Sequence, residues 1–128
     1  MSKISTISAS IMYDYKVINT ARNFTWFADE PIELGGQDEG PLPIELFLSS
    51  LASCILITLR MYAQRRNWDA GEIHIELSLS EMENGVDITK DITFSGNLEK
   101  HQIEQLHEIS KRSPLSKILS NPIDIKFA

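Results

Sequence analysis

The stretch LFLSSLASCILITL, residues 46–59, contains no charged side chain, and Glu45 and Arg60 flank it. Its fourteen residues are fewer than the about twenty that a helix needs to cross a bilayer. They predict a helix inside a folded protein, continuing through Tyr62 to about Arg66. A helix that is apolar on nearly every side must be surrounded by protein. Because one sheet covers only one of its faces, we expect a partner subunit on the other face and therefore a homodimer.

The segments before and after this helix have patterns typical of β-structure. Apolar residues occupy the odd positions of residues 7–17, which predicts a half-buried strand that bends or turns near Asp14. A further strand is expected at residues 23–28. Residues 72–80 alternate most regularly, and Asn84-Gly85 then supplies the turn of a hairpin. The returning strand is expected to carry its apolar side chains at Ile88, Ile92 and Phe94.

The last third of the chain predicts two helices and a closing strand. Apolar residues on one side mark a helix from about residue 98 to Lys111, and Ser113-Pro114 has the cap and first-position residues that begin a short second helix. Ile123, Ile125 and Phe127 alternate as in a strand. The order of elements predicts a single α+β domain over residues 1–128, built on antiparallel sheet.

The composition is that of an ordinary folded domain, with 42% apolar and 23% charged residues among 128. The single cysteine excludes an internal disulfide and favours a reducing compartment. The net charge of −6 argues against nucleic acid or an anionic membrane as a partner. Residues 1–7 alternate small polar and apolar side chains, without the apolar run of a signal peptide. These features predict a cytoplasmic protein.

Cys54 is the side chain whose type could make it a strong nucleophile, and two interpretations of it are open. A free cysteine is among the most buried residue types, so Cys54 could simply be a small core residue. A reactive thiolate needs a cation or a helix N-terminus beside it. Cys54 lies some ten residues into its own helix, so we expect an arginine or histidine from elsewhere. The helical period places five residues beside it: Phe47, Ser50, Leu51, Thr58 and Met61.

Other chemical candidates are weaker. Glu45 is nine residues before Cys54, about 180° around the helix, and is best interpreted as a favourable charge in the first turn. The three histidines (His74, His101 and His107) lack the spacing of a zinc pair, and no metal site is predicted. The glycine-rich residues 35–43 match neither dinucleotide nor phosphate-loop motifs and carry two acidic residues.

Two motifs resemble those of the OsmC/Ohr superfamily. The first runs from ADEPIELGG at residues 28–36 through GPLPIEL at residues 40–46 to the helix that carries Cys54, and the second is SPLSKIL at residues 113–119, which resembles Cys-Pro-Val-Ser-x-x-Leu. The resemblance covers about residues 21–127. It implies an OsmC-like fold, in which the sheets of an intertwined homodimer wrap around two central helices.

The resemblance implies a thiol peroxidase that reduces organic hydroperoxides with one cysteine and resolves the sulfenic acid with a second. Cys54 stands at the peroxidatic position, Ser113 at the resolving position, and Ile44 where active members carry a glutamate. Pro-x-Glu-Leu, with Glu45, matches the more distant YhfA-like branch. Arg22 is the nearest candidate for the arginine that holds the thiolate.

A two-cysteine cycle is therefore impossible within one chain. We expect a one-cysteine peroxidase of weak or conditional activity, which needs no cofactor and is recycled by an external thiol or dithiol. The alternative is a non-catalytic dimer that keeps the fold and binds an apolar small molecule beside Phe47, Leu51 and Met61. The two hypotheses differ in whether Cys54 reacts.

Overall fold

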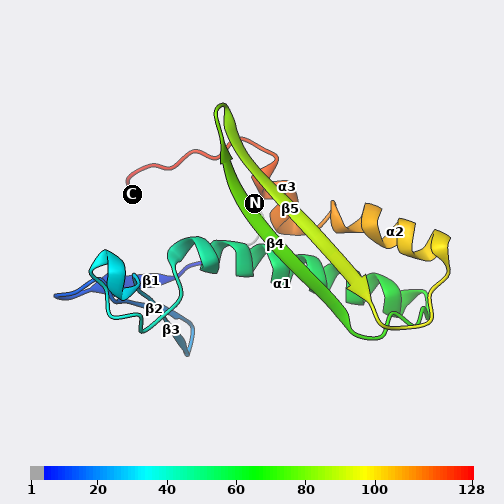
Figure 1. The fold of residues 1–128 in the computed structure, drawn as a ribbon, viewed down its shortest axis with the longest axis horizontal. Helices are drawn as coiled ribbons and strands as arrows, with labels where there is room; N and C mark the ends of the chain where they lie inside the picture. The colour runs from blue at the N-terminus through cyan, green and yellow to red at the C-terminus, as the bar shows by residue number, and fades with distance from the viewer. Residues whose placement is uncertain (1–4) are drawn as a thin grey trace. The chain divides into compact units, whose positions relative to one another are not determined.

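The computed structural model describes residues 5–128 and has a mixed α+β fold with antiparallel sheets (Figure 1). The chain forms two compact units, one ending at Phe47 and the other beginning at Leu48. Residues 1–4, on which part of the argument against a signal peptide rests, lie outside the described residues. The prediction of a single domain stays a prediction.

The first unit is a three-stranded sheet followed by a loop. Strands β1 (Ser8–Ile11), β2 (Val17–Ala21) and β3 (Phe24–Ala28) pair antiparallel in that order, and a short 3₁₀ helix, η1, spans Ile32–Leu34. A bend at residues 13–15 separates β1 from β2, which confirms the predicted turn near Asp14. The predicted half-burial is wrong for β1, whose four side chains are all exposed, because nothing in the described chain covers this strand.

The second unit contains a long helix, a hairpin and two shorter helices. Helix α1 (Pro43–Arg65) begins at the end of the first unit, and the unit continues with β4 (Ile73–Met82), β5 (Gly85–Phe94), α2 (Lys100–Ser110) and α3 (Pro114–Leu119). The hairpin register runs from Ile73 opposite Phe94 to Met82 opposite Gly85. Gly85 has a φ of 151°, a conformation that favours glycine, and the predicted Asn84-Gly85 turn is confirmed.

The core of the second unit lies between one stripe of α1 and the apolar face of the hairpin, which crosses α1 in Figure 1. Leu51, Ile55 and Leu59 recur every fourth residue and are buried together with Leu106 and Ile109 of α2. Alternate hairpin residues pack against this cluster, namely Ile73, Ile75, Leu77, Ile92 and Phe94. Apolar residues spaced about four apart in the helix therefore pack against apolar residues spaced two apart in the strands, and together they form one apolar layer.

Helix α1 has a second apolar face that its own chain leaves uncovered. Ile57 is 61% exposed and Met61 is 45% exposed, although both lie in the central and C-terminal turns of the helix. The described residues thus cover α1 with protein on one side and leave its other side uncovered. The homodimer that would supply the other side stays a prediction.

The full length of α1 bears on whether this helix could cross a membrane. The helix has 23 residues and is long and apolar enough to span a bilayer by length and composition alone. The count of fourteen uncharged residues therefore does not exclude a membrane span. A single such helix is weak evidence for one, since core helices meet the same criterion, and here Leu51, Ile55, Leu59 and Ala63 are buried against protein.

The predicted closing strand is wrong for the described chain. Residues 121–128 form no strand, and the side chains of Ile123, Ile125 and Phe127 are all exposed. Alternation shows only that a segment could form one half-buried strand, whereas a strand also needs a neighbour to accept and donate its hydrogen bonds. No such neighbour pairs with this tail among residues 5–128.

Candidate functional site

Cys54 lies in the middle of α1 and is half-buried, so its sulfur is neither sealed in the core nor fully open to solvent. Its Sγ atom accepts a hydrogen bond from the backbone N–H of Leu115, with a separation of 3.5 Å between nitrogen and sulfur. Residue 115 is 61 positions further along the chain. The contact therefore brings α1 and the first turn of α3 together at the only cysteine.

The first turn of α3 is held in place by its cap. Ser113 is fully buried, and its Oγ accepts a hydrogen bond from the Ser116 N–H at 3.2 Å. The hydroxyl groups of Ser113 and Ser116 are 2.6 Å apart. Pro114 takes the first helical position, and Leu115 packs against the core cluster. The predicted cap is confirmed, and it fixes the Leu115 N–H that reaches Cys54.

The Leu115 N–H is available as a donor to the Cys54 sulfur. It belongs to the first helical turn, whose N–H groups have no partner within the helix. The sulfur is the acceptor that this N–H finds in the folded chain. From the sequence we expected an arginine or a histidine beside Cys54, and the backbone N–H of a second helix was missed. The Ser-Pro start at residue 113 was the signal for this second helix terminus.

The other side chains predicted beside Cys54 have varied surroundings. Thr58 donates its hydroxyl to the Cys54 backbone carbonyl at 2.8 Å, and Ser50 is exposed. Leu51 is buried in the core of its own unit. Met61 lines a cavity of about 270 Å³ together with Leu56, Ile57, Arg60 and Ile73. Phe47 is half-buried at the end of the first unit.

Arg22, the candidate for the activating cation, occupies the tight turn between β2 and β3. Its φ of 54° is left-handed, and its guanidinium stacks on the Phe24 ring at 4.9 Å from the ring centre. The side chain is exposed in the first unit. The role of Arg22 stays a prediction.

Glu45 has the structural role expected of it. Its Oε1 accepts a hydrogen bond from the Leu42 N–H at 2.8 Å, so it satisfies a backbone donor just before α1 and places negative charge in the first turn. Among residues 5–128, no group of three or more histidine, cysteine or acidic side chains is arranged to hold a metal ion.

Sequence reasoning missed the role of Asp29, a buried carboxylate that organises the loop before α1. It accepts hydrogen bonds from the backbone N–H groups of Glu30 at 2.7 Å, Glu39 at 3.2 Å and Gln37 at 3.4 Å. Burial by itself raises the pKa of the Asp29 carboxyl. The three N–H bonds, with a smaller contribution from the charge of Lys16, outweigh burial, so the pKa lies below its usual value of 3.8.

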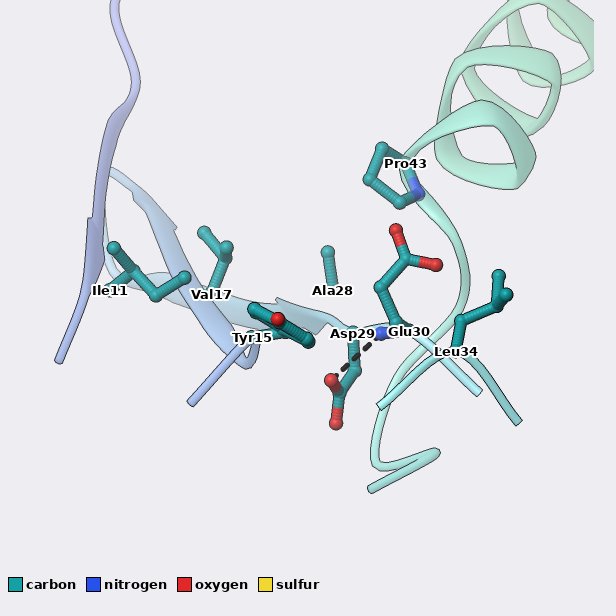
Figure 2. Close-up of a pocket in the computed structure, with 8 residues that line it drawn as sticks. All are labelled: Ile11, Tyr15, Val17, Ala28, Asp29, Glu30, Leu34 and Pro43. Carbon is teal, nitrogen blue, oxygen red and sulfur yellow. Dashed lines mark hydrogen bonds between the residues drawn. The ribbon is translucent and has the colours of Figure 1, made fainter. Parts of the chain in front are cut away.

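Asp29 also borders a cavity of about 490 Å³ in the first unit (Figure 2). The view shows its side chain turned back onto the Glu30 N–H, while the Glu30 carboxylate points toward Pro43. The remaining walls are mainly apolar, from Ile11, Tyr15, Val17, Ala28 and Leu34. One cue to this loop is visible in the sequence, namely the acidic pair within ADEPIELGG at residues 28–36.

Comparisons with known proteins agree with this fold. Solved structures with the same fold include an OsmC-like protein from Mycoplasma pneumoniae, with a TM-score of 0.82 at 22% identity over 94% of this chain and 90% of that one. An organic hydroperoxide resistance protein from Legionella pneumophila has a TM-score of 0.66 at 21% identity over 97% and 94% of the two chains. The organic hydroperoxide resistance protein OhrB of Bacillus subtilis has a TM-score of 0.64 at 20% identity over 97% and 96%.

The family assignment rests on the sequence itself, because identities this low establish the fold alone. A search of curated protein sequences finds no match. Residues 36–128 match the family described as OsmC-like protein, a span that covers well over half of the chain and includes Cys54, Ser113 and the contact between α1 and α3. The chain therefore belongs to the OsmC-like protein family, within the OsmC/Ohr superfamily.

Proposed function

We propose that this protein reduces organic hydroperoxides with Cys54 as its single redox-active group. The observation that carries the proposal is the half-buried Cys54 sulfur with the Leu115 N–H directed at it. Two structural relatives are named organic hydroperoxide resistance proteins, which supports the same chemistry. The reactive form of a cysteine is the thiolate, and the Leu115 N–H is a hydrogen-bond donor to this sulfur.

The first chemical step oxidises the cysteine by two electrons. The Cys54 thiolate attacks the terminal oxygen of the hydroperoxide, a sulfur–oxygen bond forms and the oxygen–oxygen bond breaks. The leaving alkoxide takes up a proton and departs as the alcohol, and Cys54 becomes a sulfenic acid.

The second step must use a thiol from outside the chain, because Ser113 cannot form a disulfide. An external thiol attacks the sulfenic sulfur, a mixed disulfide forms and water leaves. A second thiol then releases the reduced Cys54 and the oxidised thiol product. A dithiol can supply both sulfur atoms, so we propose an external thiol or dithiol as the reductant and no bound cofactor.

Turnover of cumene hydroperoxide with dithiothreitol tests this proposal. Wild type is expected to consume the peroxide in proportion to protein concentration, and Cys54→Ser is expected to lose that activity. Ser53→Ala is the matched control, because Ser53 is the exposed neighbour whose hydroxyl bonds the Ser49 carbonyl. Equal inactivity of wild type and Cys54→Ser would contradict the proposal.

A trapping experiment separates slow recycling from absent chemistry. Dimedone reacts with sulfenic acids, so hydroperoxide treatment without reductant is expected to give a dimedone adduct on Cys54 of wild type and of Ser53→Ala. An adduct with poor turnover would identify the external reductant as the missing component. The absence of an adduct would overturn the role of Cys54 and leave the apolar-ligand alternative.

A further inference from the structure

An oxidised Cys54 has no second thiol to react with in its own chain. Cys54 is the only cysteine of the sequence, and Ser113 stands where the resemblance places a resolving one. A sulfenic acid that meets no thiol is open to further oxidation to the sulfinic acid, a product that ordinary thiols do not reduce. A sulfenic acid can also condense with a backbone nitrogen to form a sulfenamide, which thiols do reopen.

The backbone nitrogen of Leu115 lies next to the Cys54 sulfur. The two atoms are 3.5 Å apart, and the N–H of Leu115 is directed at the sulfur. This N–H belongs to the first turn of α3, so it has no partner within the helix. If the nitrogen exchanged its hydrogen for a bond to sulfur, α3 would therefore lose none of its own hydrogen bonds.

Both atoms are held by the same core. Ser113 is fully buried and caps α3, and the Leu115 side chain packs against the core cluster of the second unit. Cys54 lies in the middle of α1, and Ile55 and Leu59 of this helix belong to that cluster. When a fold holds two reacting groups in contact, their reaction becomes unimolecular and gains over competing reactions in solution.

We propose that the Cys54 sulfenic acid condenses with the Leu115 backbone nitrogen to form a sulfenamide, which protects the sulfur until an external thiol reopens it. This inference rests on the proposed function, because the organic hydroperoxide is the oxidant that makes the sulfenic acid. A sulfur–nitrogen bond forms, the sulfur–oxygen bond breaks, and the hydroxyl leaves with the amide hydrogen as water. The external thiol then attacks the sulfur, a mixed disulfide forms and the nitrogen regains a hydrogen.

Mass spectrometry of the wild-type protein tests the sulfenamide. After treatment with cumene hydroperoxide in the absence of thiols and dimedone, the chain is expected to weigh two hydrogens less than the reduced chain. Trypsin digestion without thiols should leave peptide 23–60, which contains Cys54, joined to peptide 113–117, which contains Leu115. Fragmentation should place the link at the nitrogen of residue 115, and dithiothreitol should separate the two peptides.

The dimedone experiment distinguishes failure of this inference from failure of the proposed function. A protein whose Cys54 gives a dimedone adduct, but which forms no cross-link or a cross-link at another residue, would overturn the sulfenamide and leave the peroxidase proposal standing. A protein that gives neither product would contradict both proposals.

Two variants of residue 115 test the protective role. Leu115→Pro removes the amide hydrogen at a position where α3 does not use it, and Leu115→Met keeps the hydrogen and nearly the same side-chain volume. Both should give the dimedone adduct and a far-UV circular dichroism spectrum like that of wild type. With excess hydroperoxide, Leu115→Pro should form no cross-link and accumulate Cys54 sulfinic acid several-fold faster than Leu115→Met. Equal rates of sulfinic acid formation would contradict protection, and the cross-link map of wild type decides the bond itself.

Discussion

Ser113 has a hydroxyl group at the position where the resemblance places a second, resolving cysteine. It caps α3, and its Oγ accepts a hydrogen bond from the Ser116 N–H. The same turn directs the Leu115 N–H to the Cys54 sulfur. Position 113 therefore lies in the turn that reaches Cys54.

Ser113→Cys is expected to restore an internal disulfide with Cys54. After treatment with an organic hydroperoxide, the variant should lose both free thiols and have a mass lower by two hydrogens, because the new thiol attacks the Cys54 sulfenic acid. Intact-mass spectrometry with thiol counting measures both changes.

Ser113→Ala is the control for that prediction. It should form no internal disulfide, and it should lose about 0.5–2 kcal/mol of unfolding free energy because the cap is gone. If oxidised Ser113→Cys instead accumulated only over-oxidised Cys54, position 113 would be out of reach of the sulfur.

At the scale of the elements, sequence periodicity predicted the hairpin and α1 well. Residues 72–80 alternate in sequence and form β4 as Ile73–Met82, since every second residue packs on one core. The predicted strand in the tail does not form. The alternation of Ile123 and Ile125 shows which side chains would share a face of a strand, but it does not show which segment would pair with that strand. A ladder depends on which other segment lies alongside, and this information is not local.

The sequence identified which residues belong to the candidate site, but it did not predict which of them contact one another. Cys54 was identified as the sole cysteine, and Ser113 as a helix cap, from local signals. The hydrogen bond between Leu115 and Cys54 joins positions 61 residues apart and follows from how α1, α2 and the hairpin pack. Asp29 was missed because a carboxylate in an acidic loop gives no sign, in sequence, that three backbone N–H groups will surround it.

The loop between β3 and α1 is expected to lose stability in acid through Asp29. Because its folded pKa is lower than the unfolded value of 3.8, its stabilising contribution is present above that pH and disappears as the pH falls through the folded value. Urea unfolding of wild type and Asp29→Asn should therefore differ most at neutral pH and converge below pH 3.8.

Glu33→Gln serves as the control for the acid experiment, because Glu33 is an exposed acidic residue of η1 in the same loop. It should leave the midpoint of urea unfolding nearly unchanged at neutral pH. A gap between wild type and Asp29→Asn that stayed constant across the acid range would show that the ionised carboxylate is not what holds the loop.

At the scale of the whole molecule, the described chain leaves much apolar surface uncovered. Ile57 and Met61 lie on the outer face of α1, Ile125 is 91% exposed, and Phe127 is fully exposed in the tail. Soluble monomers rarely expose extended apolar patches, and such patches mark interfaces. The described chain covers neither this face of α1 nor the tail at residues 121–128.

We therefore expect a homodimer in solution, with a light-scattering mass of twice the 14.5 kDa of the chain. Ile57→Glu should shift the mass toward that of one chain, because a buried unpaired carboxylate at the interface is costly. Thr93→Glu adds the same charge on the polar face of β5, opposite His74, and should leave the mass unchanged. A wild type that has the mass of one chain at every concentration would rule out the dimer, and the exposed faces of α1 and of the tail would then need another partner.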